Sequence, residues 1–207
     1  MSVLRWIVVG HADKGIEYTG NWTTNDGTKY DTQGNFGATY RGLHGATGIA
    51  NFSYVFNGSF PLFFLVEKVL NFKARIVGAQ GRIMGTNNIK NSSGVLDPVW
   101  ECFIDGVSIG VGNATIFPYI ENNWQLCNWY TLTPGQHTIT VNVNSRSQAF
   151  FFDRFEYLPS GQLDGAGILV NQLDPDLRYD SNWQTLGTMA QITQKTGATV
   201  FFPFVGL

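Results

Sequence analysis

Apolar and polar residues alternate along several segments of this chain. Aromatic residues occupy positions 52, 54 and 56, and aliphatic residues occupy 139, 141 and 143 between threonines and asparagines. A similar two-residue step relates Phe151, Phe155 and Tyr157. This step puts one set of side chains on each face of a strand, so one face is buried and the other is solvated. The pattern predicts a sandwich of antiparallel sheets.

Turn signals and composition agree with this fold class. Asp105-Gly106 and Pro134-Gly135 lie between the β-rich runs, and Asp-Gly is a strong hairpin dipeptide. The chain has 24 glycines, 14% aromatic residues and only 14% charged residues, which is typical of strands joined by tight turns. Only residues 61–76 resemble a helix, and their pattern is poor. We predict an all-β protein.

A sequence repeat defines the domain organisation. The pattern of residues 16–22, with Tyr18 and Trp22, returns 161 residues later at 177–183. Residues 50–58 are echoed by 198–206 with the same spacing from alanine to phenylalanine to glycine. Such self-similarity indicates two copies of one module. We expect an N-terminal extension at 1–14, a first module at 15–159, a linker at 160–167 and a truncated second copy at 168–207.

Charge and hydropathy exclude two classes of partner. The net charge of −2 supplies no basic surface for nucleic acid or for anionic membranes. The longest apolar run, Phe60–Val66, is far shorter than the roughly 18 residues that a membrane span requires. The first ten residues lack the length and cleavage site of a secretory signal.

Two features favour an extracellular protein. Cys102 and Cys127 lie 25 positions apart and form either one disulfide in an oxidising compartment or two buried thiols. Glycosylation sequons occur at Asn21, Asn51, Asn57, Asn91 and Asn113. We expect a glycoprotein at the cell surface or outside the cell, with any signal peptide and membrane anchor outside this chain.

A family resemblance rests on a series of motifs in a fixed order. They are Tyr18 with Trp22, Phe56–Gly58, Met84–Asn91, Trp100–Gly106, Glu121–Cys127, Pro134–Val141 and Phe152–Tyr157. Together they resemble a family of basidiomycete surface proteins, over residues 15–159 and again over 168–207. The resemblance implies tandem galactose-binding-like jelly rolls in which Cys102 and Cys127 are paired.

Residues 60–81 depart from the family pattern. Lys68, Lys73 and Arg75 lie there among apolar residues without strand alternation, where the resemblance implies a short strand continuation. Our hypothesis is an unspliced intron or similar gene-model error, which sequencing of the transcript would test. The alternative is a genuine surface loop or lid.

Catalytic constellations are missing from the sequence. It has no Gly-x-Ser-x-Gly elbow, HExxH motif or phosphate-binding glycine loop. We expect His137 to cap or pack at a strand start, and Asp153 to form hydrogen bonds at a turn or strand edge. Asp97, Glu101 and Asp105 either form turns or hold calcium, and turn formation is the favoured interpretation. We assign no catalytic residue, metal ligand or cofactor.

Sugar recognition fits the residue types better. It needs an aromatic ring against the sugar's C–H face, and amides and carboxylates for its hydroxyls. The wider candidates are Trp22, Asn91, Asp97, Trp100 and Trp129, and the best are Asn87, Asn88, Glu121, Asn122, Asn123 and Trp124. The best candidates fall in predicted loops. The bland interpretation is that the tryptophans pack in the core and the asparagines shape turns.

Three functions follow from these observations. The first is a non-catalytic carbohydrate-binding module at a fungal cell surface. The second is a structural or adhesive ectodomain with no sugar site, which buried loop aromatics would favour. The third is a hydrolase acting on wall polysaccharide. A truncated copy would also expose strand edges, which predicts self-association through residues 168–207.

Overall fold

The computed structural model describes residues 5–31, 37–58, 79–112, 114–159, 166–187 and 190–203. In these ranges the chain forms antiparallel strands and one short 3-10 helix, η1 (Thr28–Tyr30), which confirms the predicted all-β class. The strands of the main body are β1 (Trp6–Gly10), β2 (Ile16–Asn25), β3 (Leu43–Gly58), β4 (Ala79–Asn87), β5 (Lys90–Ser92), β6 (Val95–Asp97), β7 (Val99–Ile104), β8 (Val107–Gly110), β9 (Glu121–Leu132) and β10 (Gly135–Tyr157).

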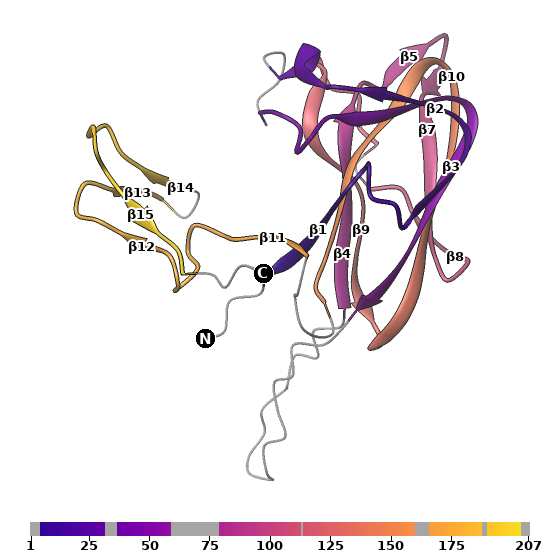
Figure 1. Ribbon diagram of the computed structural model, residues 1–207. Helices are drawn as coiled ribbons and strands as arrows, with labels where there is room; N and C mark the ends of the chain where they lie inside the picture. Colours follow the sequence, from indigo (N-terminus) through magenta and orange to yellow (C-terminus); the bar gives the residue numbers. More distant parts are fainter. Residues whose placement is uncertain are drawn as a thin grey trace, which may run out of the picture.

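The long strand β10 organises this sandwich-like body (Figure 1). Its first part, residues 135–145, pairs with β3 and β7. Its last part, residues 151–157, pairs with β4 and, over 154–157, with β1. The edges are extended by β2 beside β3, β8 beside β7 and β9 beside β4. One strand therefore holds together elements from both ends of the module.

Asp97 stabilises the irregular middle of β10. The register against β3 shifts between Ser145 and Phe150. There the buried Asp97 carboxylate accepts the backbone N–H groups of residues 146, 147 and 148 at 2.8, 2.6 and 2.8 Å. Burial alone would raise the pKa of Asp97, but these donors outweigh it and lower the pKa to about 2. Asp97 is thus fully engaged in shaping the backbone.

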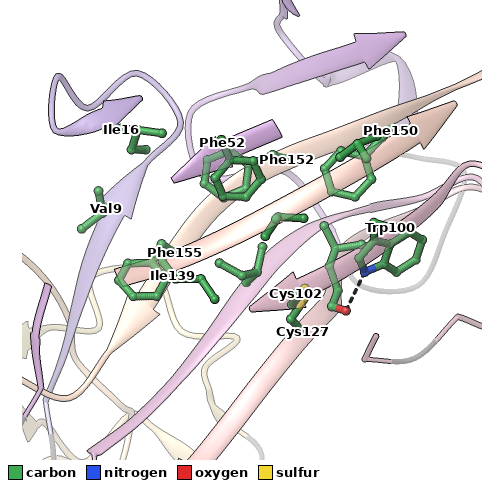
Figure 2. Close-up of a cluster of buried hydrophobic side chains, with 14 of the residues drawn as sticks. Val9, Ile16, Phe52, Trp100, Cys102, Cys127, Ile139, Phe150, Phe152 and Phe155 are labelled. Carbon is green, nitrogen blue, oxygen red and sulfur yellow. Dashed lines mark hydrogen bonds between the residues drawn. A yellow bond between two sulfur atoms is a disulfide. The ribbon is translucent and has the colours of Figure 1, made fainter. Parts of the chain in front are cut away.

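The alternating residues form the core, as predicted. Phe52, Phe56, Ile139, Val141 and Val143 are all buried. They pack with the aromatic side chains of the last part of β10, and Figure 2 shows these rings gathered between the strands. No helix in the part of the chain described here is long and apolar enough to cross a membrane.

A disulfide joins Cys102 on β7 to Cys127 on β9, with their Cα atoms 6.5 Å apart. Both residues are buried, so the bridge predicted from the sequence forms inside the core. Beside it, the Trp100 indole N–H donates to the Leu126 carbonyl at 2.9 Å (Figure 2). These two links tie strands that do not pair with each other in the sheet.

The Asp105-Gly106 hairpin also forms as predicted. It connects β7 to β8 between the opposed residues Ile104 and Val107. Both turn residues have positive φ, 50° and 78°, which an Asp-Gly pair adopts more readily than other residues.

Two expected boundaries differ from the observed elements. The N-terminal extension, 1–14, supplies β1, whose Ile7 and Val9 are buried in the core. The expected insertion, 60–81, ends within β4, where Gly81 lies opposite both Trp129 and Tyr157. Its residues 60–78 lie outside the described part of the chain, as do residues 160–165 of the expected linker.

Residues 166–187 and 190–203 form short paired strands, most of which lie apart from the main body in Figure 1. β11 (Gly167–Leu169) pairs with β1, β12 (Arg178–Tyr179) with β15 (Val200–Phe201), and β13 (Gln184–Leu186) with β14 (Ala190–Ile192). Several apolar side chains here are exposed, including Leu173, Leu186 and Phe201. This segment therefore lacks a buried core of its own within the described residues.

Candidate functional site

The structure brings the best sequence candidates together, and all of them except Asn88 are strand residues. Asn87 ends β4 and lies opposite Glu121, which begins β9. Asn88 follows β4, and Asn122 follows Glu121 within β9. All four are buried, with exposed fractions of 8% or less. The expectation that residues 121–124 form a loop is wrong, because they lie in β9, where Glu121 pairs with Asn87 and Trp124 with Gly85 on either side of a register shift.

The amides of these residues form hydrogen bonds within the protein. Asn87 donates to the Thr115 carbonyl and Asn88 to the Ala149 carbonyl, both at 2.8 Å. Asn122 accepts from the Thr86 hydroxyl at 2.7 Å and donates to the Asp31 carboxylate at 2.9 Å. These contacts hold neighbouring loops to the ends of β4 and β9. In this conformation the three buried amides bind other parts of the protein and position these loops.

Asn123 links this cluster to a different segment. Its backbone has a φ of 53°, and its side chain donates to the Ala38 carbonyl at 2.7 Å. It also accepts from Nη1 of Arg154 at 2.7 Å. Asn123 therefore helps to fix residues 37–42, which lead into β3.

The tryptophan candidates pack mainly in the core. Trp100, Trp124 and Trp129 are each 8% exposed or less. Trp22 is half-buried, and its ring packs edge-on against Phe52 with 5.8 Å between centroids. The bland interpretation of the tryptophans is therefore the one that the observed packing favours.

An open cleft of about 550 Å³ lies elsewhere, beside β1. Val8 and Gly10 of β1, the turn residues 11–13, Gly167 of β11, Tyr40 and Arg41 line it. Its polar groups come from two segments, the turn after β1 and the segment before β3. These segments are far apart in sequence and meet because β1 and β3 both pair with β10.

The buried Asp153 holds the two cleft walls together. Its carboxylate accepts the Tyr40 backbone N–H at 3.1 and 3.3 Å, and its backbone carbonyl accepts the His11 N–H at 2.8 Å. Burial raises the pKa of Asp153, and the nearby Arg154 guanidinium, 2.6 Å away, opposes that rise. Asp153 forms hydrogen bonds as the sequence predicted, but it does so from a buried position within β10 and not at a turn.

The cleft presents an aromatic ring beside opposite charges. The Tyr40 residue is 39% exposed, and the Arg41 guanidinium carbon lies 5.0 Å from its ring centre. Asp13 is exposed on the facing turn. Burial lowers the pKa of His11, so the imidazole that lines the cleft is neutral at pH 7. The cleft thus offers guanidinium and hydroxyl donors, a carboxylate acceptor and a partly open ring.

Comparison of the chain with protein-family models, curated proteins and solved structures finds no match. The site must therefore be interpreted from its own geometry.

Sequence reasoning missed Asp13, Tyr40 and Arg41. A signal was present, because Tyr40-Arg41 stands between Gly37 and Gly42, both with positive φ, as an aromatic residue within a turn-rich segment. Asp13 lies in residues 1–14, which the sequence prediction places outside the module.

The three acidic residues considered for calcium have separate partners. Asp97 accepts backbone N–H groups of β10, Glu101 accepts from the Ser108 hydroxyl, and Asp105 pairs with His137. Among the described residues no group of three or more histidines, cysteines or carboxylates is placed to hold a metal ion. The turn-forming interpretation is the one that these contacts favour.

His137 and Asp105 form a pH-dependent link at the start of β10. His137 Nδ1 lies 2.7 Å from the Asp105 carboxylate, and Nε2 lies 2.7 Å from the Thr133 carbonyl. Burial opposes protonation of His137, but both acceptors outweigh it and raise the pKa above 6.5. The pKa of Asp105 is lowered below 3.8, because the His137 and Thr138 donors outweigh its desolvation.

We expect replacement of His137 with glutamine to destabilise the protein more at pH 5.5 than at pH 8.5. The stabilisation by a raised pKa is fully present below the unfolded value of 6.5 and is lost as pH rises through the folded value. The effect should be modest, because the Asp105 side chain is 49% exposed. Urea unfolding at both pH values measures it, with Gln136→Ala as the control. A loss of stability independent of pH would contradict the prediction.

The described sequons lie on accessible strands and turns. Asn21, Asn57 and Asn91 are exposed, and Asn51 is half-buried. Asn113 falls outside the described residues.

Proposed function

We propose that this chain is a non-catalytic, extracellular carbohydrate-binding module of a fungal cell surface. The observation that carries the proposal is the cleft in which Tyr40, Arg41 and Asp13 lie together. A sugar ring places its C–H face on an aromatic ring and its hydroxyls against charged donors and acceptors. The cleft combines these groups in an open site of a size suited to a small ligand.

The composition of the cleft supports binding without hydrolysis. Among its lining residues Asp13 is the one carboxylate, whereas glycoside hydrolysis ordinarily uses a pair of carboxyl groups about 5 to 10 Å apart. His11 is neutral and has no carboxylate partner among its described contacts. We therefore favour binding of polysaccharide over its hydrolysis as the function of the cleft.

The extracellular part of the proposal rests on covalent features. A buried disulfide is favoured in an oxidising compartment, and three of the sequons lie on exposed residues where glycans could be added. The fungal surface comes from the family resemblance of the sequence.

We further propose that the module is a galactose-binding-like jelly roll and that residues 168–207 begin a second copy. Equivalent local hydrogen bonds support the second copy. Asp13 Oδ1 accepts the Gly15 N–H at 2.8 Å, and Asp174 Oδ1 accepts the Asp176 N–H at 3.0 Å, at the repeat offset of 161 residues. The same offset relates the turns 10–13 and 171–174, each closed by one backbone hydrogen bond.

The aromatic pair of the repeat supports the same proposal. Tyr18 and Trp22 pack edge-on with 5.0 Å between centroids, and Tyr179 and Trp183 do so at 5.3 Å. Each tyrosine hydroxyl donates to the carbonyl seven residues earlier, at 2.6 and 3.2 Å. Each tyrosine also faces the corresponding residue of the second shared motif, position 52 in the first copy and 200 in the second.

The test is binding of the full secreted chain to a glycan array and to insoluble fungal wall polysaccharides. We expect Tyr40→Ala to weaken binding at least tenfold, about 1.4 kcal/mol, because it removes the ring that meets the sugar face. The control is Tyr130→Ala, which removes a more exposed tyrosine, 58% accessible, that does not line the cleft. Equal losses in both variants, or no binding by a folded chain, would contradict the proposal.

Burial of the tryptophans favours one alternative, a structural or adhesive ectodomain with no sugar site. In that case the exposed edges of its sheets, and not its cleft, would carry the function. Within the described residues β15 pairs on one side only, with β12, and Phe201 is 58% exposed. This supports self-association through residues 168–207. Sedimentation of the full chain tests it, since a monomer at all concentrations would exclude this route.

A further inference from the structure

β1 and β11 occupy equivalent positions in the two proposed copies. The offset of 161 residues that relates Tyr18 to Tyr179 extends back to the strands, where it relates Ile7 to Ile168 and Asp13 to Asp174. The two strands pair directly and antiparallel. The edge strand of one copy therefore lies against the same edge strand of the next.

The register of this pairing is two-fold symmetric. Ile7 lies opposite its own equivalent, Ile168. Trp6 lies opposite Leu169, and Val8 lies opposite Gly167. At the offset of 161, Trp6 is equivalent to Gly167, and Val8 is equivalent to Leu169. Exchanging equivalent residues therefore turns the pair Trp6–Leu169 into the pair Gly167–Val8. A surface that meets a copy of itself in this way is the isologous type found in two-fold symmetric assemblies.

A partly buried ion pair locks this contact. Arg5, directly before β1, donates Nε to Asp174 Oδ2 at 2.8 Å and Nη2 to Asp174 Oδ1 at 3.0 Å. Its Nη2 also contacts the Asp176 carboxylate. The side chain of Asp174 is fully buried, and this two-pronged geometry is among the stronger charge-assisted contacts. Asp174 and Asp176 belong to the turn after β11, so Arg5 holds the second copy to the first.

We propose that the β1 edge is a self-complementary interface by which two consecutive copies of this module join, strand to strand, with Arg5 as the lock. The partner that fits the edge is a second copy of the module, turned about a two-fold axis through Ile7 and Ile168. This inference rests on the second copy proposed above. The pairing of β1 with β11 would join the sheets of the two modules into one continuous sheet.

The joint also forms part of the cleft. Gly167 of β11 lines it, and a Cβ at this position would lie 3.3 Å from the Val8 carbonyl oxygen and 3.5 Å from the Tyr40 hydroxyl. Glycine thus permits close approach of both the partner strand and the cleft tyrosine. A ligand in the cleft would contact both copies.

A pair of engineered cysteines tests the register. We expect Ile7→Cys with Ile168→Cys to form a bridge within one chain on mild oxidation, because opposed residues of an antiparallel pair share a face. Ile7→Cys with Leu169→Cys is the matched control, since neighbouring positions of a strand point to opposite faces. Peptide mapping of the monomer by mass spectrometry identifies the bridges. Equal bridging in both variants, or bridging only between chains, would overturn the proposal.

Hydrogen exchange tests the lock without new cysteines. In the full chain we expect Arg5→Ala to speed exchange of the β11 amides at least tenfold while β3 and the first part of β10 are unchanged. The control, Arg178→Ala, removes an exposed arginine of β12 and should leave β11 protected. Unprotected β11 amides in the unaltered chain would overturn the joint. If Arg5→Ala speeds exchange only in β12 and β15 and leaves β11 protected, Arg5 is not the lock. If β11 is protected in an unaltered chain that binds no glycan, the sugar site fails and the joint stands.

Discussion

Replacing Phe155 with alanine is expected to lower the free energy of unfolding by about 3–5 kcal/mol. Phe155 is fully buried in the last part of β10, opposite Val9 of β1 and Ile83 of β4. Its ring stacks on Trp129 and on Tyr157, with centroid separations of 5.5 and 5.0 Å. Truncation would leave a cavity among large rigid rings that cannot collapse to fill it.

Urea unfolding with linear extrapolation measures this loss. Val55→Ala is the control, because Val55 lies in β3 with 52% exposure and should change stability by less than about 0.5 kcal/mol. Phe155→Leu keeps most of the volume and should fall between the two. A loss below about 1 kcal/mol in Phe155→Ala would show that this position is not in a packed core.

Removing the disulfide is expected to cost about 3 kcal/mol, the loop-closure value for cysteines 25 positions apart. The change is the double variant Cys102→Ala with Cys127→Ala, which avoids a single unpaired thiol. The bridge links β7 to β9, which do not pair directly, so its loss frees the denatured chain and weakens a contact between separate parts of the sheet.

The reduced, unaltered protein separates the bond from the packing of the sulfur atoms. It should lose most of the same stability while keeping the volume of both buried side chains. If the reduced protein matched the oxidised one and only the alanine variant were destabilised, packing rather than cross-linking would be responsible.

Burial in β9 was hard to predict because its first residues are polar. Glu121, Asn122 and Asn123 belong to types that are depleted in strands, so a loop is the natural local interpretation. Glu121 lies opposite Asn87 of β4, Asn122 donates a hydrogen bond to Asp31, and Asn123 donates one to the Ala38 carbonyl. None of these partners is near in sequence.

The cleft depended on the same kind of long-range pairing. Asp13 and Tyr40 are separated by β2, and they meet because the distant Asp153 binds the backbone of both segments. A two-residue period identifies which side chains share a face of a strand, but it carries no information on which strand will lie alongside.

The all-β class, the buried faces of β3 and β10, the Asp-Gly hairpin and the sequence repeat could be predicted from the sequence, because each depends on local periodicity or spacing. The disulfide was one of two interpretations that the sequence left open, and folding decided it. Long-range packing places β1 in the core, buries the amides of Asn87, Asn88 and Asn122, and brings Arg5 to Asp174. These outcomes depend on contacts between segments up to 171 residues apart, which backbone pairing selects and local residue preferences do not encode.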